Sequence, residues 1–384
     1  MQVYLVGGAV RDQLLGLTPH ERDWVVVGAT PEEMQRLGYR SVGRDFPVFL
    51  HPETAEEYAL ARLERKVGPG YRGFVTEFSP QVTLEQDLER RDLTINAMAR
   101  RADGSIVDPF GGRADLERRL LRHVSPAFVE DPVRVLRVAR FAARFAPLGF
   151  RVAPETAELM RAIVRAGEAA ALVPERVWRE LERALGEPRP GAFFETLVDC
   201  GALEVVMPEL APLWAPTAPA AHAMGAAALQ VAATAGDAGP VRFAALVASL
   251  PAVQIDSLCA RLRAPNDYRE LAALAARLGE HLHGGGGALP SVLAQDPARV
   301  LELLESADAF RRPERFGAWL RVLSARAIAG GVPPAAAAEF AARLGTAAER
   351  AAAVRLGPAD LAGAAGPRLA DRLRALRLEA LGRA

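Results

Sequence analysis

The stretch Leu17–Gly28 reads LTPHERDWVVVG and places two acidic residues at the start of a β-branched run. Glu21 and Asp23 stand two positions apart there. Because side chains alternate across a strand, this spacing puts both carboxylates on one face, with their Cα atoms about 7 Å apart. Such a pair is typical of a site that holds two metal ions. A solvated acidic turn is the structural alternative.

A pair of glycines precedes this stretch. The segment QVYLVGG predicts a short strand that ends in Gly7 and Gly8, and AVRDQLLG predicts a helix that carries Arg11. Backbone N–H groups at such a turn, with the positive end of the helix behind them, favour the binding of a triphosphate. The carboxylate pair and the glycine turn together favour a nucleotide site over an ordinary strand-to-helix junction.

Composition indicates a folded chain of more than one domain. Half of the 384 residues are hydrophobic and a quarter are charged, and this length exceeds one ordinary core. Lysine plus arginine and aspartate plus glutamate number 47 each, so any RNA-binding surface must be local. Cys200 and Cys259 show no metal-ligand spacing and cannot form a disulfide framework, which fits a cytoplasmic protein. Without a signal-like N-terminus or a run of about 18 apolar residues, neither secretion nor membrane insertion is expected.

Hydrophobic periodicity divides the chain into a mixed α/β part and a helical part. Strand-like and helix-like segments alternate over about the first 120 residues, whereas nearly everything from Asp131 onward reads as helix. The expected strands are QVYLVGG, DWVVVG, FPVFLH, EEYALAR and SIVDPF, and the longest expected helix among them is TLEQDLERRDLTINAMARR. The change of pattern near Asp131 predicts a domain boundary.

Transfer of a nucleotidyl group by two metal ions needs acidic ligands, cations for the leaving pyrophosphate and a means of choosing the base. Glu57, in EEYALAR, is a candidate third carboxylate, as metal ligand or as base toward an attacking hydroxyl, and a surface acid is the alternative. Arg11 and Arg91 are candidate phosphate ligands, because guanidinium groups pair well with phosphate oxygens. In RRDLTINA, Asp92 and Asn96 lie at i and i+4 of an expected helix, within reach of a ribose hydroxyl.

The segment VEDPVRVLRVARFAARF predicts a helix that begins at Pro132. Spacings of three, three and four gather its arginines on one face. These are Arg134, Arg137, Arg140 and Arg144. A solvated arginine stripe is the alternative. Asp131 with Arg134 offers an acceptor and a donor, which fits the amino group and ring nitrogen of cytosine or adenine and leaves unpaired groups against uracil and guanine.

The series LVGGAVRD, ERDW, GRDFPVFL, EYALARLERK, RRDLTINA, DPFGG and EDPVRVLRVARFAARF resembles the class II tRNA nucleotidyltransferases, the bacterial CCA-adding enzymes within the polymerase-β-like superfamily. The resemblance is dense over residues 1–150 and looser to about residue 210. It implies an α+β nucleotidyltransferase head over residues 1–122, an all-α neck with a base-reading helix over 123–210, and a helical body and tail over 211–384. The implied reaction is template-independent addition of C, C and A to the 3′ end of tRNA, gripped by its acceptor half, from CTP and ATP.

The resemblance also implies roles for individual residues. Glu21 and Asp23 would bind Mg²⁺, and Asp131 and Arg134 would read the base. The residues implied to bind ATP or CTP are Gly8, Arg11, Arg91, Arg137 and Arg140. Glu21 departs from the family, which usually has aspartate there, and its longer side chain can coordinate magnesium with a different geometry.

The C-terminal part departs from the long members of the family, which carry an HD-type phosphohydrolase domain. Ala248 and Ser249 stand where the family has His and Asp, and the histidine-rich loop that would follow is missing. His222, His281 and His283 remain, but without the shared aspartate they make a poor metal site. We expect a retained helical scaffold without hydrolase activity.

Other functions stay open at this level. Poly(A) addition and a partial activity that adds only CC or only A are the alternatives within the same class, and GRDFPVFLH, where poly(A) polymerases usually run like GRRFRLAHV, favours the tRNA enzyme. A catalytically idle tRNA-binding protein is the alternative from another class. The intact pair of Glu21 and Asp23 argues against it, because a binder needs no metal ligands.

Overall fold

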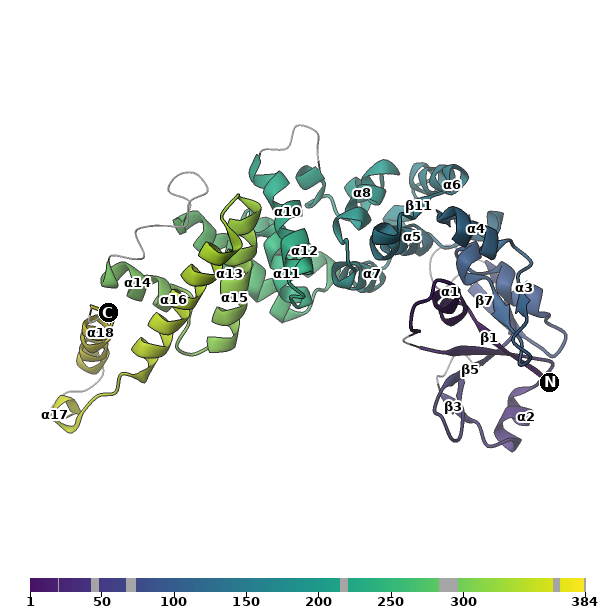
Figure 1. The fold of residues 1–384 in the computed structure, drawn as a ribbon, viewed down its shortest axis with the longest axis horizontal. Helices are drawn as coiled ribbons and strands as arrows, with labels where there is room; N and C mark the ends of the chain where they lie inside the picture. The colour runs from purple at the N-terminus through teal and green to yellow at the C-terminus, as the bar shows by residue number, and fades with distance from the viewer. Residues whose placement is uncertain are drawn as a thin grey trace. The chain divides into compact units, whose positions relative to one another are not determined.

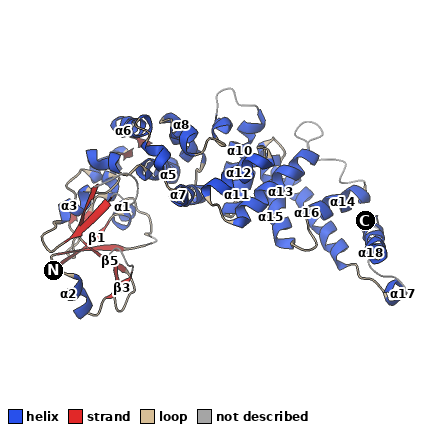
Figure 2. Ribbon diagram, turned by 180° about the vertical axis from the view of Figure 1, so that it is seen from behind, coloured by secondary structure: helices blue, strands red, loops and turns tan. Residues whose placement is uncertain are grey.

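The computed structural model describes residues 1–19, 21–42, 48–66, 74–214, 220–282, 296–361 and 367–382. The chain forms two compact units, Met1–Ala184 with Ala192–Met207 and Leu185–Gly191 with Pro208–Ala384. The described strands lie in the first unit, and the second is built of helices (Figures 1 and 2). An α+β head followed by helices is the predicted fold class.

A seven-stranded mixed sheet organises the head, in the order β3-β4-β5-β2-β1-β8-β9. Its central strand β2 pairs antiparallel with β1 and parallel with β5. The strands are β1 (Gln2–Val6), β2 (Asp23–Val27), β3 (Arg40–Val42), β4 (Val48–Leu50), β5 (Glu57–Leu60), β8 (Ala99–Arg100) and β9 (Ile106–Val107). The predicted strands thus form, although several are shorter than the hydrophobic runs that predicted them.

Both faces of the sheet are buried, which explains why its central strand is a continuous apolar run. Val25 packs in a cluster with Leu88 of α3 (Leu84–Glu89), whereas Val26 packs in another with Met34 of α2 (Pro31–Arg36). Adjacent residues of a strand point to opposite faces, so a helix on each side covers the sheet. This packing fixes β2, and with it the position of Asp23 at its first residue.

The remaining elements of the first unit are mostly helical. Helix α5 (Val133–Phe145) begins one residue after the predicted start and is buried along almost its whole length, including Arg134 and Arg140. The other elements are α1 (Gly8–Leu14), β6 (Arg62–Lys66), β7 (Phe74–Phe78), η2 (Thr94–Asn96), α4 (Gly112–Arg118), β10 (Leu120–Leu121), η3 (Pro126–Glu130), η4 (Ala146–Leu148), β11 (Arg151–Val152), α6 (Pro154–Arg165), η5 (Glu168–Ala171), α7 (Pro174–Gly186), α8 (Gly191–Asp199) and α9 (Ala202–Val206).

The expected long helix over TLEQDLERRDLTINAMARR is wrong. A capping box at Thr83 starts α3, but the helix ends at Glu89 and is followed by the single turn η2 and then by β8. The side chain of Asp92 accepts a hydrogen bond from the backbone N–H of Leu93, which competes with helix continuation. Burial of Leu93 and Ile95 in the core fixes this irregular path.

The second unit is an array of helices. Its elements are η6 (Ala211–Trp214), α10 (Ala220–Thr234), α11 (Gly239–Val247), α12 (Ala252–Leu262), α13 (Asn266–Leu282), α14 (Pro297–Ser306), α15 (Pro313–Ala329), α16 (Pro334–Ala353), α17 (Pro358–Leu361) and α18 (Pro367–Gly382). The segment FAALVASL is helical and buried over residues 243–247, the end of α11, whereas Ala248, Ser249 and Leu250 follow the helix. None of the helices in the described ranges is long and apolar enough to cross a membrane.

Candidate active site

The ends of three neighbouring strands bring the predicted site together. Asp23, the first residue of β2, is in register with Val6 at the end of β1 and with Glu57 at the start of β5. The glycine turn follows Val6 directly. Asp23, Glu57 and the turn therefore meet at one edge of the head sheet.

The carboxylates of Glu21 and Asp23 are electrostatically coupled. Removal of the Asp23 carboxylate from water raises its pKa, Arg91 opposes the rise, and Glu21 adds to it. Both residues remain accessible to solvent. Among the described residues, no group of three His, Cys, Asp or Glu side chains that could hold an ion is found. Paired oxygen donors that repel each other nevertheless suit a hard divalent cation.

The glycine turn is shaped by Arg91. Gly7 has φ +67°, and a Cβ there would lie 2.7 Å from Nη1 of Arg91, so the turn needs glycine for both conformation and space. Arg91 donates to Asp87 from Nη2 at 3.3 Å and to the carbonyl of Asn96 from Nη1 at 3.5 Å. Its buried Nε has no hydrogen-bond partner within the part of the chain that is described. The long hydrogen bonds of its two terminal nitrogens, beside the glycine turn, suit this guanidinium to an anion there.

Arg11, the second predicted phosphate ligand, lies inside the protein. Its side chain donates to Asp12 from Nε at 2.8 Å and to Oδ1 of Asn96 from Nη1, and it is 3% exposed. Burial lowers the pKa of Arg11, and the adjacent Asp12 opposes that effect. A Cβ on Gly8 would lie 3.3 Å from Nη2, so the guanidinium supports the glycine turn from behind.

Asp92 and Asn96 contact each other instead of projecting from a helical face. The amide of Asn96 donates to Asp92 at 2.9 Å, and both residues are 6% exposed. Burial alone would raise the pKa of Asp92, but the charge of Arg137 and hydrogen bonds from Asn96 and Leu93 hold it below its ordinary value. The helical geometry proposed for a ribose contact is therefore wrong.

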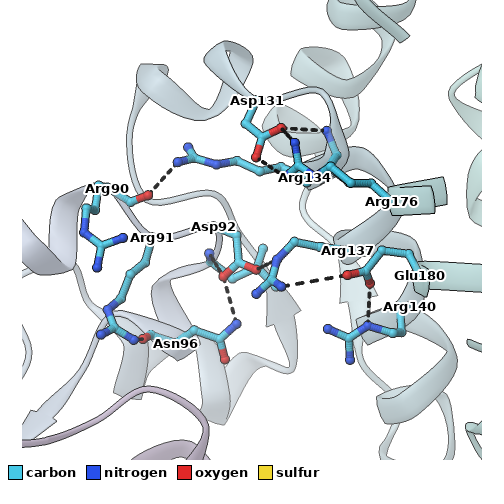
Figure 3. Close-up of polar contacts among 12 residues, drawn as sticks. Arg90, Arg91, Asp92, Asn96, Asp131, Arg134, Arg137, Arg140, Arg176 and Glu180 are labelled. Carbon is cyan, nitrogen blue, oxygen red and sulfur yellow. Dashed lines mark hydrogen bonds and ion pairs between the residues drawn. The ribbon is translucent and has the colours of Figure 1, made fainter. Parts of the chain in front are cut away.

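The arginines of α5 are internal ion-pair partners, so the alternative of a solvated stripe is wrong. Arg137 donates to Asp92 at 2.7 Å, and Arg140 donates to Glu180 at 2.7 Å (Figure 3). Arg144 donates to Asp12 at 2.9 Å. Asp92 and then Glu180 raise the pKa of Arg137 against the effect of burial. Ion pairs thus join α5 to the head and to α7.

Asp131 and Arg134 lie at the start of α5, as predicted, but each has a different protein partner. Asp131 accepts two hydrogen bonds from Arg176 of α7, at 3.1 and 2.8 Å (Figure 3). Arg134 donates to the backbone carbonyls of Ala127 and Arg90. These contacts fix the orientation of an acceptor and a donor that stand three positions apart in the chain.

Sequence reasoning missed Arg176 and Glu180. They lie four positions apart on α7, on one face of that helix, and contact the predicted base-reading and phosphate-binding residues of α5. The signal was present in PERVWRELERALG, whose apolar face carries two charges of opposite sign. The sequence of that segment does not predict which residues pair with those two charges.

The region around Ala248 and Ser249 is closely packed. A Cβ on Gly225 of α10 would lie 2.4 Å from the carbonyl oxygen of Leu246, so α10 and α11 approach closely there. Arg326 of α15 donates to the carbonyl of Ala245. The side chains of His222 and His281, and all of His283, lie outside the described residues.

Residues 3–122 match the family model of the Poly A polymerase head domain, and residues 149–213 match a model described as a probable RNA and SrmB-binding site of polymerase A. With a mixed sheet, an acidic pair and a glycine turn held by arginine, the fold and site define a nucleotidyltransferase of the polymerase-β-like type.

Full-length relatives identify the family more closely. The Multifunctional CCA protein of Thioalkalivibrio sulfidiphilus (strain HL-EbGR7) is 58% identical over 346 residues, 83% of each chain. The CCA-adding enzyme of Pseudomonas putida (strain W619) is 51% identical over 381 residues, 99% of this chain and 98% of that one. The crystal structure of the Bacillus stearothermophilus CCA-adding enzyme in complex with CTP aligns with 99% of this chain and 89% of its own, at a TM-score of 0.70 and 26% identity. The chain belongs to the bacterial CCA-adding enzymes.

We predict that Asp23→Asn stabilises the protein in the absence of divalent cations. The pKa of Asp23 is raised on folding from an ordinary value of 3.8, so its charged form opposes folding at any pH above that range. The gain should be about 1–2 °C in the unfolding temperature at pH 7, where the carboxylate is charged. It should shrink as pH falls through the raised pKa and vanish below the ordinary value.

Thermal unfolding from pH 3 to pH 8 in chelator measures the effect. Glu53→Gln, on an exposed loop of the same unit, is the control for loss of one negative charge. A lower unfolding temperature for Asp23→Asn at pH 7 would contradict the predicted coupling.

Proposed function

We propose that the chain adds C, C and A in sequence to the 3′ end of tRNA. The terminal hydroxyl of the RNA attacks the α-phosphate of CTP or ATP, a new phosphodiester bond forms, and pyrophosphate leaves. The observation that carries this proposal is the meeting of Asp23, Glu57 and the glycine turn at one sheet edge, with the guanidinium of Arg91 over Gly7. The reaction is assigned to this site because the chain belongs to the CCA-adding enzymes.

Glu21 and Asp23 are the proposed ligands for Mg²⁺. Their carboxylate oxygens are the donors that this ion prefers, and their mutual repulsion favours a bound cation. Mg²⁺ would stabilise negative charge on the α-phosphate and leaving group. Glu57 is the proposed base for the attacking hydroxyl, and its register with Asp23 on β5 supports this role.

Arg91 and Arg137 are the proposed ligands of the triphosphate. Nη1 of Arg91 lies over Gly7 of the glycine turn, and the side chains of Arg91 and Arg137 are 19% and 35% exposed. Arg11 and Arg140 are 3% and 7% exposed, so we assign them to the support of the site in its nucleotide-free form. Phosphate oxygens would meet two guanidinium groups already held in place, which lowers the entropy cost of binding.

Asp131 and Arg134 are proposed to select the base. A carboxylate can accept up to about four hydrogen bonds, and Asp131 accepts two from Arg176 and one from the N–H of Val133. An acceptor site thus remains for the amino group of cytosine or adenine. Uracil and guanine would place a carbonyl there, against a carboxylate, and leave polar groups unpaired.

The C-terminal unit is proposed to lack HD-type hydrolase activity. A methyl group and a hydroxyl stand where the family has an imidazole and a carboxylate, and Ser249 Oγ is buried with no hydrogen-bond partner in the described ranges. We expect no hydrolysis of 2′,3′-cyclic phosphates or phosphomonoesters with Ni²⁺, Co²⁺ or Mn²⁺. Metal-dependent hydrolysis that survives Asp23→Ala would contradict this assignment.

Extension of a tRNA that lacks CCA tests the proposed reaction. With Mg²⁺, CTP alone should add two residues, and CTP with ATP should add three and then stop. Asp23→Ala should lose at least about 100-fold in single-turnover rate, because a transition-state stabiliser is removed, while tRNA binding persists. A ladder of adenylates would indicate poly(A) addition, and arrest after CC in the presence of ATP would indicate a partial enzyme.

Loss of base choice tests the reading pair. Arg176→Gln should release the Asp131 carboxylate and reduce the preference for CTP over UTP by about tenfold, because orientation of the acceptor is lost. Asp131→Ala should reduce it at least as much. The measurement is the rate at which each nucleotide, supplied separately, is added to the tRNA.

The control is Arg179→Gln, which removes the same charge from the exposed face of α7. It should leave the preference unchanged. If Asp131→Ala lowers the rate with full discrimination, the pair positions the helix and does not read the base.

A further inference from the structure

Glu180 is a buried carboxylate that faces the two arginines in the middle of α5. Its Oε2 accepts a hydrogen bond from Nε of Arg140 at 2.7 Å, and its Oε1 lies 3.9 Å from Nη1 of Arg137 (Figure 3). Glu180 is 5% exposed and Arg140 is 7% exposed. Within the described chain these two arginines are the charged groups that Glu180 contacts, and the contact with Arg140 is the shorter of the two.

The place of Glu180 has an electrostatic consequence for any polyanion. A triphosphate that binds Arg137 lies near the buried carboxylate of Glu180, whose Oε1 is 3.9 Å from Nη1 of that arginine. Charges in a partly buried site are screened less than charges in water, so the repulsion acts on the bound ligand. Asp92 also pairs with Arg137, but hydrogen bonds from the side-chain amide of Asn96 and the backbone N–H of Leu93 hold it within its own segment.

We propose that Glu180 is an internal counter-anion, a positioning residue that is held by Arg140, competes with the phosphates for Arg137 and so speeds the release of pyrophosphate. The inference rests on the proposed role of Arg137 in holding the triphosphate. Without a ligand, Glu180 keeps both guanidinium groups ordered. With pyrophosphate bound, it weakens the hold of Arg137 on the product.

Such a device suits an enzyme that must empty its site repeatedly. Each addition leaves pyrophosphate on the same arginines that must hold the next triphosphate, and the third addition uses a different nucleotide from the first two. Arginine binds polyphosphate tightly, so a site of arginines without a competing anion would retain its product. A carboxylate that pairs with those arginines offsets part of this affinity.

Glu180→Gln tests the proposal, because it keeps the shape of the side chain and removes the charge. Titration calorimetry of the full chain with inorganic pyrophosphate and Mg²⁺ should show about three- to tenfold tighter binding, the size expected for one charge in a partly exposed site. The affinities for CTP, ATP and UTP should rise by similar factors, because the effect acts on phosphate and not on the base. The unfolding temperature should fall, since buried Arg140 loses its carboxylate partner.

Tighter pyrophosphate binding together with a lower unfolding temperature distinguishes the proposal from a purely structural role. A structural role predicts lower stability with weaker or unchanged pyrophosphate binding, and that result would overturn the proposal. In steady-state extension both KM for CTP and kcat should fall together, with stronger inhibition by added pyrophosphate. Glu182→Gln, the same change on the exposed face of α7, is the matched control and should shift pyrophosphate affinity by less than about twofold.

Two further variants keep the outcome interpretable. If Glu180→Gln unfolds, Glu180→Asp retains the charge but withdraws it by one methylene, and it should tighten pyrophosphate binding in the same direction by a smaller factor. Unchanged or weaker binding there would contradict the proposal. Arg137→Gln tests the proposed role of Arg137 on which the inference rests. If this variant leaves pyrophosphate affinity unchanged, the assignment of Arg137 as a triphosphate ligand is wrong. If it weakens pyrophosphate binding but Glu180→Gln does not tighten it, only the role of Glu180 as a counter-anion is rejected.

Discussion

The ion pair between Arg137 and Asp92 is the contact on which the arrangement of the site depends. It joins α5 to the chain segment that leads from α3 into η2, and Asp92 is almost completely buried. Loss of Arg137 would leave the buried Asp92 carboxylate without its charged partner, which destabilises the folded chain. The pair therefore fixes the distance between the helix that carries the proposed base-reading residues and the sheet edge that carries the acidic pair.

Further contacts extend from this pair in both directions. Asp92 accepts from Asn96, and Asn96 accepts from Arg11, which supports the glycine turn. On the other side Arg137 faces Glu180, which binds Arg140. Positive groups suited to a polyanion are thus held in a ligand-free protein by carboxylates of its own. The same charges give the site its order and limit its affinity, which is the physical basis of the inference on Glu180.

Patterns local in sequence predicted much of this molecule. The glycine pair and helix α5, which begins one residue after the predicted start, follow from turn chemistry and helical periodicity. Strand alternation does not apply to Glu21, because β2 begins at Asp23. The register of β2 with β5 brings Glu57 beside Asp23. The helix expected through Asp92 failed because tertiary burial and an aspartate turn override propensity. Arg176 and Glu180 were missed because pairing across helices leaves no trace in local spacing.

A structure of the protein with CTP and Mg²⁺ bound tests the central claim most directly. The account predicts phosphate oxygens against Arg91 and Arg137, a metal ion on Glu21 and Asp23, and the cytosine amino group within hydrogen-bond distance of Asp131, which keeps its two bonds from Arg176. A triphosphate bound away from the glycine turn, or a base with no contact to Asp131 and Arg134 in a complex that supports extension, would contradict it.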